Sequence, residues 1–372
     1  MTGEMLSYDS AQRARHAAQV AGRKIVVIGG GTGLSTLLLG LKEYTHNITA
    51  VVTVTDDGGS SGMLRREFGI LPPGDIRNCI HALARTGGLL TPLLNHRFHS
   101  GSLKNQNFGN LLLLALNEIS GSFTEAVENM SKILAITGKV LPVTEEPIVL
   151  RATFEDGSVV MGETKITAAK KKNQKNIHKM ELVPNDPEPL DAAIAAIEEA
   201  EVIIMGPGSL YTSVLPNLLV PGVCDAIRRS NALTMHVLNL MTQDGETEHC
   251  TALDHLQILQ RYGGSDLVDV CIYNTQPINH RLMLRYSQAG CEQLIPQEED
   301  FRAAGVRGFG SALLAYDGKY VRHDPLRTAY FIMKTLNEIA PRDAFLGAYD
   351  RHLLKQEYLC LLPPTLKLNY AE

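Results

Sequence analysis

The strongest constraint on the fold is a short apolar run that leads directly into a glycine cluster. Residues 25–28 are Ile-Val-Val-Ile, and residues 29–33 are Gly-Gly-Gly-Thr-Gly. Consecutive β-branched residues without polar alternation predict a strand buried on both faces, as in a parallel sheet. Residues 34–41 then predict a helix and residues 48–54 a second buried strand. The order predicts a βαβ unit whose glycine loop brings backbone N–H groups to a helix N-terminus, where a phosphate can bind.

The same alternation of strands and helices continues along most of the chain. Apolar periodicity predicts further helices at 75–85, 111–119, 123–136, 190–200, 253–262, 279–289 and 324–339. Short apolar runs predict strands at 202–205, 232–238 and 267–273. We therefore expect an α/β fold, with a Rossmann-like, open and mostly parallel sheet flanked by helices.

Several segments fall outside this alternation. Residues 138–188 predict short strands joined by a turn at 155–158, and we interpret them as a β insertion or subdomain within an α/β domain spanning 23–339. The lysine-rich stretch 165–175 inside the insertion is interpreted as a solvated loop. Residues 311–322 predict a closing hairpin around Asp317 and Gly318. Residues 1–22 and 340–372 show little pattern, and we expect tails or a peripheral cover.

Composition restricts the partners and the compartment. The formal net charge of −5 over 372 residues argues against a general nucleic-acid binder, which needs a basic surface. No apolar stretch approaches the roughly 20 residues of a membrane helix. Six cysteines without a Cys-x-x-Cys pair indicate buried thiols rather than a zinc or redox motif. We expect a soluble cytoplasmic protein without a membrane span, and a homo-oligomer is compatible with these features.

Two adjacent carboxylates follow the second predicted strand. Asp56 and Asp57 open the run Asp-Asp-Gly-Gly-Ser-Ser-Gly. Carboxylates at this position bind a ribose hydroxyl, hold Mg²⁺ beside a diphosphate, or cap the next helix. We expect one of the pair to cap a helix and at least one to serve a ligand.

Two predicted helices begin with polar residues. Gly74 and Asp75 follow a Pro-Pro turn, and Asp75 is expected to be the N-cap of its helix. Arg77 and Asn78 would then face a phosphate or a base at the helix N-terminus. Residues 107–110, Asn-Phe-Gly-Asn, place two amides at the start of the next apolar helix, with a structural and a functional interpretation equally open.

Two further loops follow predicted strands. Residues 206–213 read Gly-Pro-Gly-Ser-Leu-Tyr-Thr-Ser, and residues 239–247 read Asn-Leu-Met-Thr-Gln-Asp-Gly-Glu-Thr. The carboxyl ends of parallel strands meet at one edge of a sheet, where ligands of open α/β folds bind. Three such loops rich in Gly, Ser, Thr and Asn predict a cradle for a polar ligand.

This combination of motifs resembles the bacterial gluconeogenesis-factor family (YvcK type), which is related to 2-phospho-L-lactate transferase. The resemblance covers roughly residues 23–336. It implies a cytoplasmic Rossmann-like protein that binds UDP-sugars such as UDP-N-acetylglucosamine and supports growth and cell shape on gluconeogenic carbon sources. No reaction is established for that branch, whereas the related transferase binds a guanosine diphosphate donor with Mg²⁺.

The resemblance also implies which residues contact the nucleotide. Carried over by motif, they are Gly30, Gly31, Thr32, Gly33, Asp56, Asp75, Asn78, Gly206, Gly208, Ser209, Asn239, Thr242, Tyr286 and Arg322. From the motifs themselves we add Asp57, Gly74 and Asn110 as candidate site residues, and in a transferase Asp56 and Asp57 would hold Mg²⁺. Tyr286 would stack on or hydrogen-bond the ligand, and Arg322 would pair with the diphosphate. Asp244 stands where the family usually has proline.

Three functions follow from these observations. The leading hypothesis is a nucleotide-sugar-binding factor, and the alternative is a Mg²⁺-dependent transferase acting on a nucleotide diphosphate. The third, an NAD-dependent dehydrogenase, depends on the first glycine loop alone. That loop lacks the third glycine of a dinucleotide fingerprint, because Leu34 occupies its place.

Overall fold

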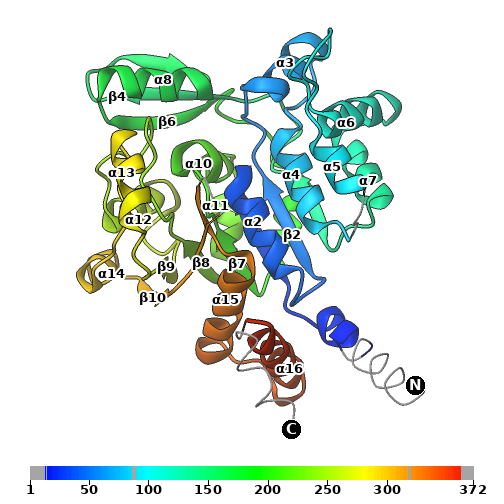
Figure 1. Cartoon of the computed structure of the whole chain (residues 1–372), viewed down its shortest axis with the longest axis vertical. Coiled ribbons are helices and arrows are strands. Elements are labelled where there is room, and N and C mark those ends of the chain that lie inside the picture. Colours follow the sequence, from blue (N-terminus) through cyan, green and yellow to red (C-terminus); the bar gives the residue numbers. More distant parts are fainter. Residues whose placement is uncertain (1–12, 14, 86–88, 317–319, 362–372) are drawn as a thin grey trace.

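The computed structural model describes residues 13, 15–85, 89–316 and 320–361. Its centre is a seven-stranded sheet in the order β10-β9-β8-β7-β1-β2-β3, in which every pair of neighbours is parallel (Figure 1). The strands are β1 (Ile25–Gly29), β2 (Ile48–Val52), β3 (Lys139–Pro142), β7 (Val202–Met205), β8 (Leu233–Val237), β9 (Val270–Asn274) and β10 (Arg307–Ser311). The predicted α/β fold with an open parallel sheet is confirmed.

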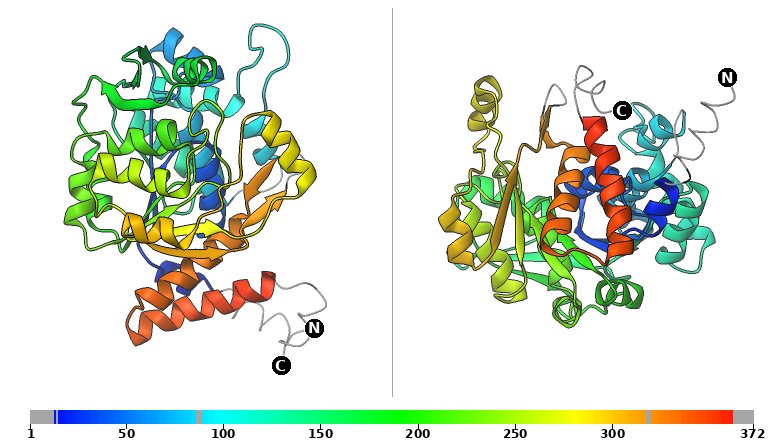
Figure 2. Two further views of the ribbon diagram at one scale, coloured as in Figure 1. Left: turned by 90° about the vertical axis from the view of Figure 1, so that its left-hand side faces the viewer. Right: turned by 90° about the horizontal axis from the view of Figure 1, so that it is seen from below.

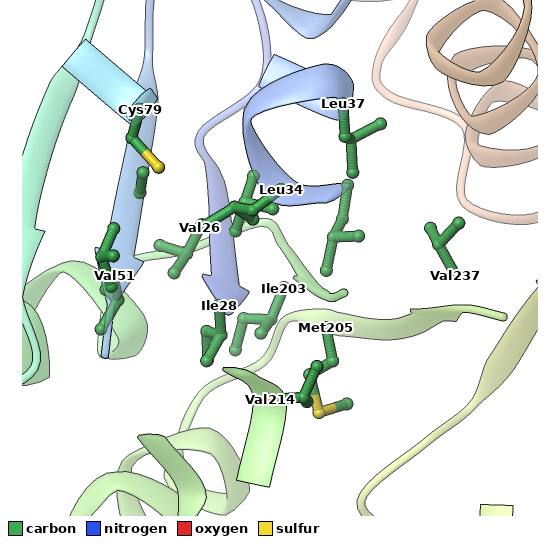
Figure 3. Close-up of a cluster of buried hydrophobic side chains, with 14 of the residues drawn as sticks. Val26, Ile28, Leu34, Leu37, Val51, Cys79, Ile203, Met205, Val214 and Val237 are labelled. Carbon is green, nitrogen blue, oxygen red and sulfur yellow. The ribbon is translucent and has the colours of Figure 1, made fainter. Parts of the chain in front are cut away.

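Helices cover both faces of this sheet. The helices α2 (Gly31–Leu41), α4 (Gly74–Leu83) and α15 (Pro325–Ile339) pack together on one face, and α9 (Asp191–Glu198), α10 (Leu215–Leu218) and α11 (Val223–Arg229) pack together on the other (Figure 1). Leu34 of α2 lies over Val26 and Ile28 of β1 in Figure 3, and all three are almost fully buried. Burial on both faces explains why β1 is apolar without alternation.

The other helices flank this core. They are α3 (Gly59–Phe68), α5 (Leu90–Asn95), α6 (Phe108–Ile119), α7 (Phe123–Ile133), η1 (Leu210–Val214), α12 (Ala252–Gly263), α13 (His280–Gln288) and α14 (Glu298–Ala304). Capping side chains determine where several of these helices begin. Helix α6 begins at Phe108, not at the expected residue 111, because the Asn107 side chain accepts a hydrogen bond from the Asn110 N–H at 3.1 Å.

The insertion is smaller than the sequence indicates. Its first expected strand, β3, pairs with β2 and belongs to the main sheet. The separate antiparallel sheet has the order β5-β4-β6, with β4 (Val149–Phe154), β5 (Val159–Met161) and β6 (Ile177–Val183). The lysine-rich stretch is not a loop, because it forms most of helix α8 (Glu163–Asn173), which packs on β4 and β5 (Figure 1).

The closing hairpin consists of β11 (Leu314–Tyr316) and β12 (Val321–His323), which pair antiparallel. The expected turn residues Asp317 and Gly318 lie outside the described residues. The segment after 340 is more ordered than a tail, since it forms α16 (Ala344–Leu361), which packs on α15 at one end of the molecule (Figures 1 and 2). Residues 15–20 are also helical, and Ala18 is fully buried.

Within the described part of the chain, no single helix is long and apolar enough to cross a bilayer. Two consecutive helical segments, Leu210–Leu218 and Val223–Arg229, are together long and apolar enough, but they are bent by 70° relative to each other.

Candidate functional site

The order of strands creates a switch point between β1 and β7. From β1 the chain proceeds to β2 on one side, whereas β7 lies on the other side and leads to β8. The loops that follow these two strands therefore diverge at the carboxyl edge of the sheet, which is where open α/β folds bind ligands. Residues 29–33 and 206–209 meet at this point.

The first glycine loop is also the first turn of α2. The helix starts at Gly31, not at Leu34 as expected, and its N-cap residue, Gly30, has no side chain to cap it. Gly31 has a positive φ of 67°, which favours glycine. A Cβ on Gly33 would lie 2.4 Å from the Pro207 carbonyl oxygen, so glycine is needed for the two loops to meet. Uncapped N–H groups at a helix N-terminus are a site for an anion.

Side chains from the loop after β8 hold the second glycine loop. Asn239 exchanges two hydrogen bonds with Gly208, accepting from its N–H at 3.1 Å and donating to its carbonyl at 2.8 Å. Gln243 Nε2 donates to Ser209 Oγ at 2.9 Å. Asn239 therefore positions the loop through its own side chain, and Gly206, with a φ of +77°, starts the turn behind it.

The third wall comes from α13 and the β11–β12 hairpin. Tyr286 Oη accepts a hydrogen bond from the Val321 N–H at 2.8 Å, which joins the helix to the hairpin. The Arg322 guanidinium lies over the Tyr320 ring at 5.3 Å. Thr242 Oγ1 accepts from the Glu292 N–H at 2.8 Å and fixes the neighbouring loop.

These three walls enclose a cleft of about 470 Å³. Ten of the predicted residues line it: Gly30, Gly31, Thr32, Gly33, Gly208, Ser209, Asn239, Thr242, Tyr286 and Arg322. A larger hollow of about 900 Å³ lies between α7 and α9 near the start of β1 and contains none of the predicted residues. We assign the site to the smaller cleft, because among the described residues the N-terminus of α2 and the loops after β7 and β8 come together only there.

The two adjacent carboxylates do not act as a pair. Asp56 Oδ1 accepts from the Gly58 N–H at 2.9 Å in the turn before α3. Asp57 Oδ1 accepts from the N–H and the hydroxyl of Thr164, at 3.0 and 2.6 Å. The expected cap exists, but it stabilises the N-terminus of α8, far along the chain. Within the described residues, no three His, Cys, Asp or Glu side chains are arranged to hold a metal ion.

The N-terminus of helix α4 is not capped as the sequence predicts. Pro73 is its N-cap, so the expectation that Asp75 caps the helix is wrong. Gly74 is its first residue, and a Cβ there would meet Ser61 Oγ at 2.4 Å. Asp75 instead accepts the Gly31 N–H and lies against the glycine loop. Burial and the nearby charge of Asp56 raise the pKa of Asp75 to about 6.

The expectation that Arg77 faces a ligand is also wrong. Its Nε donates to Asn110 Oδ1 at 3.3 Å and its Nη1 to Asn95 Oδ1 at 2.9 Å, so it joins α4 to α5 and α6. Asn110 is 2% exposed and donates to Ser60 Oγ at 3.1 Å, which is a structural role. Asn78 is half-buried in α4 and does not line the cleft.

Two acidic residues beside the cleft were not predicted as site residues. Glu246 is 6% exposed and accepts from Thr212 Oγ1 at 2.9 Å. Burial raises its pKa to about 7, against the opposing hydrogen bonds of Thr212, Ser209 and Tyr211. Burial, followed by the charges of Asp56 and Glu246, raises the pKa of Glu163 well above its ordinary value. Glu246 belongs to the loop noted in the sequence, whereas nothing in the sequence of α8 indicated Glu163.

Known proteins are similar to this chain over most of its length. The family model described as 2-phospho-L-lactate transferase CofD matches residues 25–314. A Bacillus subtilis protein named gluconeogenesis factor is 42% identical over 316 residues, covering 85% of this chain and 98% of that protein. One named gluconeogenesis factor from Halalkalibacterium halodurans is 44% identical over 313 residues, covering 84% of this chain and 96% of the relative.

A solved structure has a similar fold. The crystal structure of a UPF0052 family member from Bacillus halodurans superposes with a TM-score of 0.79 at 44% identity, covering 82% of this chain and 98% of that one. The family model spans β1 to the first residue of β11, so it includes both glycine loops and Tyr286, whereas Arg322 on β12 lies beyond it. The chain belongs to the CofD family, among the members named gluconeogenesis factors.

Proposed function

We propose that the cleft binds a nucleotide sugar of the UDP-N-acetylglucosamine type, with the diphosphate at the N-terminus of α2. The observation that carries the proposal is the first turn of α2 at Thr32 and Gly33, which lines the same cleft as Arg322 and whose N-cap residue, Gly30, has no capping side chain. Helix N–H groups and a guanidinium are the partners that a diphosphate needs. Tyr286, on the same wall as Arg322, offers a ring against which a base or sugar can lie.

The biological role proposed for this binding follows the names of the relatives. As a cytoplasmic gluconeogenesis factor, the protein would sense a nucleotide sugar and support growth and cell shape on gluconeogenic carbon sources. The charge of Asp244, in the loop after β8, is paired with Lys171 of α8 at 2.8 Å.

Calorimetric titration with UDP-N-acetylglucosamine tests the proposal. A ligand that binds only the native state at 100 times its Kd stabilises the protein by about 2.7 kcal/mol. We expect binding with a rise in Tm, and Arg322→Gln should weaken binding at least tenfold. The matched control is Arg302→Gln, which removes an exposed guanidinium on α14. No heat and no Tm shift at millimolar ligand would contradict the proposal.

A second candidate is a Mg²⁺-dependent transferase with a nucleotide diphosphate donor, because the matching family model describes a phospholactate transferase. The predicted ligand pair does not fit this ion well, since one Asp57 oxygen is committed to the α8 cap. Turnover of a guanosine-diphosphate donor that Mg²⁺ stimulates and Asp56→Asn abolishes would support the transferase. Absence of turnover with deazaflavin acceptors would count against it.

A further inference from the structure

The wall of the cleft carries one acidic side chain, that of Asp244 in the loop after β8. Among the lining residues in the described part of the chain, Asp244 is the only Asp or Glu, and Arg322 is the only Lys or Arg. The cleft therefore has a cationic end and an anionic end. The Asp244 side chain is 37% exposed, so its carboxylate is open to a molecule bound in the cleft.

A series of hydrogen bonds places Tyr286 between these two charges. Its hydroxyl accepts from the Val321 N–H, next to Arg322, at 2.8 Å. Its carbonyl accepts from the Cys291 N–H at 2.9 Å, and the Cys291 thiol is hydrogen-bonded to the Asp244 backbone. The order along this wall is therefore Arg322, Tyr286, Cys291 and Asp244. A ligand whose diphosphate pairs with Arg322 would carry a sugar ring along Tyr286 toward Asp244.

Both neighbours of Asp244 hold it in place. The Gln243 side chain donates to Ser209 Oγ at 2.9 Å, which ties this loop to the second glycine loop. Gly245 has a φ of +85° and lies against α8, where a Cβ would come within 2.6 Å of the Thr167 side chain. A carboxylate between two residues fixed in this way is preorganised to meet a ligand.

Lys171 of α8 determines which oxygen of Asp244 a ligand can use. Its ammonium lies 2.8 Å from Asp244 Oδ2, whereas Oδ1 accepts no hydrogen bond from the described residues. Because the ammonium already neutralises the carboxylate, a divalent cation would meet a like charge at this place. An uncommitted carboxylate oxygen is an acceptor for a hydroxyl donor.

We propose that Asp244 determines the specificity of the cleft by accepting, through Oδ1, a hydrogen bond from a sugar-ring hydroxyl of the ligand. Lys171 is a positioning residue in this arrangement, because it holds Oδ2 and leaves Oδ1 to the ligand. The inference depends on the proposed nucleotide-sugar function and names the residue that recognises its sugar. The ribose and the attached sugar both carry such hydroxyls, and the choice of ligands distinguishes them.

The sign of the effect separates hydrogen bonding from charge. A carboxylate repels a nearby diphosphate, so a purely electrostatic role of Asp244 predicts that Asp244→Ala binds the ligand more tightly. Loss of a hydrogen bond to a charged acceptor predicts weaker binding instead. The two roles therefore change the affinity in opposite directions.

Calorimetric titrations with UDP-N-acetylglucosamine, UDP and 2′-deoxy-UDP test the proposal. Asp244→Ala should bind UDP-N-acetylglucosamine roughly fivefold or more weakly. Asp244→Asn, which keeps a carbonyl oxygen, should lose less, and exposed Asp186→Asn is the matched control. If the attached sugar supplies the hydroxyl, Asp244→Ala binds UDP with unchanged affinity. If the ribose supplies it, the variant also loses affinity for UDP, and an unchanged affinity for 2′-deoxy-UDP identifies the 2′-hydroxyl.

Variants of Lys171 test the positioning role. Lys171→Met should weaken binding of UDP-N-acetylglucosamine, and Lys171→Arg should largely restore it. When Lys171→Met is added to Asp244→Ala, the affinity should change by less than about twofold, because Lys171 acts through Asp244. An equal loss with and without Asp244 would overturn the positioning role.

The outcomes also separate this inference from the proposed function. If none of the three ligands binds the unmodified protein, the nucleotide-sugar function is wrong and the role of Asp244 falls with it. If they bind, and Asp244→Ala binds as well as the unmodified protein or more tightly, the function stands and the role of Asp244 is overturned. The Tm of each unliganded variant shows whether it folds. If Asp244→Ala does not, a loss of about twofold or more in Asp244→Asn is the expected result, and no loss overturns the role.

Discussion

At the scale of single residues, the site depends on where charge is buried. Glu246 is buried between η1 and the loop after β8, and its carboxylate accepts a hydrogen bond from the Thr212 hydroxyl at 2.9 Å. Asp75 lies beneath the glycine loop. Both side chains are harder to ionise than in water because desolvation outweighs their hydrogen bonds.

The raised pKa of Glu246 predicts a pH-dependent stability. The folded protein holds this proton up to about pH 7, whereas an ordinary Glu releases it near 4.5. Its contribution to stability is therefore complete below pH 4.5 and is lost as the pH rises through about 7. Relative to Glu246→Gln, the wild type should gain about 1.4 kcal/mol per pH unit as the pH falls from 7 to 5.

Urea unfolding of both proteins at pH 5, 6, 7 and 8 measures this difference. Taking the difference between the two proteins removes the opposing effect of buried His236 and His323, whose lowered pKa values cost stability as the pH falls. Parallel pH profiles for the wild type and Glu246→Gln would show that Glu246 titrates normally.

Residue roles were the hardest to predict from sequence. The motifs correctly placed Gly30 to Gly33 and Gly208 at one cleft, because strand ends of a parallel sheet share an edge. They did not show that Asp75 lies inside its helix or that Arg77 points toward Asn110. Those orientations depend on Pro73 as the N-cap and on the packing of α5 and α6, which no local pattern encodes.

At the scale of elements, α8 connects the insertion to the site. Asp57 caps its first turn, Lys170 pairs with Glu248 in a mostly buried contact, and Lys171 pairs with Asp244. The helix thus bridges the loop after β2 and the loop after β8. Its sequence has few apolar residues, so tertiary contacts and not amphipathicity stabilise it, which is why the sequence indicated a loop.

Removal of the α8 cap should weaken the insertion. Asp57→Ala deletes the acceptor for the Thr164 N–H and hydroxyl, and losing such a cap typically costs about 0.5–2 kcal/mol. Asp57→Asn keeps an acceptor and should lose less. Thermal unfolding and hydrogen exchange of α8 measure both, with exposed Asp186→Ala as the control. Unchanged exchange in Asp57→Ala would exclude the capping role.

At the scale of the whole molecule, the two ends of the described chain meet in a buried ion cluster. Asp350 of α16 is 2% exposed and lies 3.4 Å from Arg23 Nε and 3.6 Å from Arg342 Nη1. Arg23 Nη2 also donates to the Ala340 carbonyl at 2.6 Å. The flanking segments, expected to be tails or a peripheral cover, therefore form part of the packed structure. Sequence periodicity missed them because long-range charge pairs leave no local pattern.

Breaking this cluster should destabilise the protein strongly. Asp350→Ala removes the ion-pair partner of buried Arg23, whereas Arg342 keeps Glu201 at 3.3 Å, and removing one partner of a buried pair costs about 3–5 kcal/mol. The exposed pair of Lys334 and Glu338 gives the comparison, since Glu338→Ala should cost at most about 0.5 kcal/mol. Urea unfolding measures both, and equal losses would show that α16 is only loosely attached.

The central claim is that the first turn of α2 holds the diphosphate of a nucleotide sugar. A crystal structure of the protein with UDP-N-acetylglucosamine tests it most directly. The account predicts the diphosphate within hydrogen-bonding distance of the Thr32 and Gly33 N–H groups, with Arg322 on the opposite side. A ligand bound in the hollow between α7 and α9, or with its diphosphate away from α2, would contradict it.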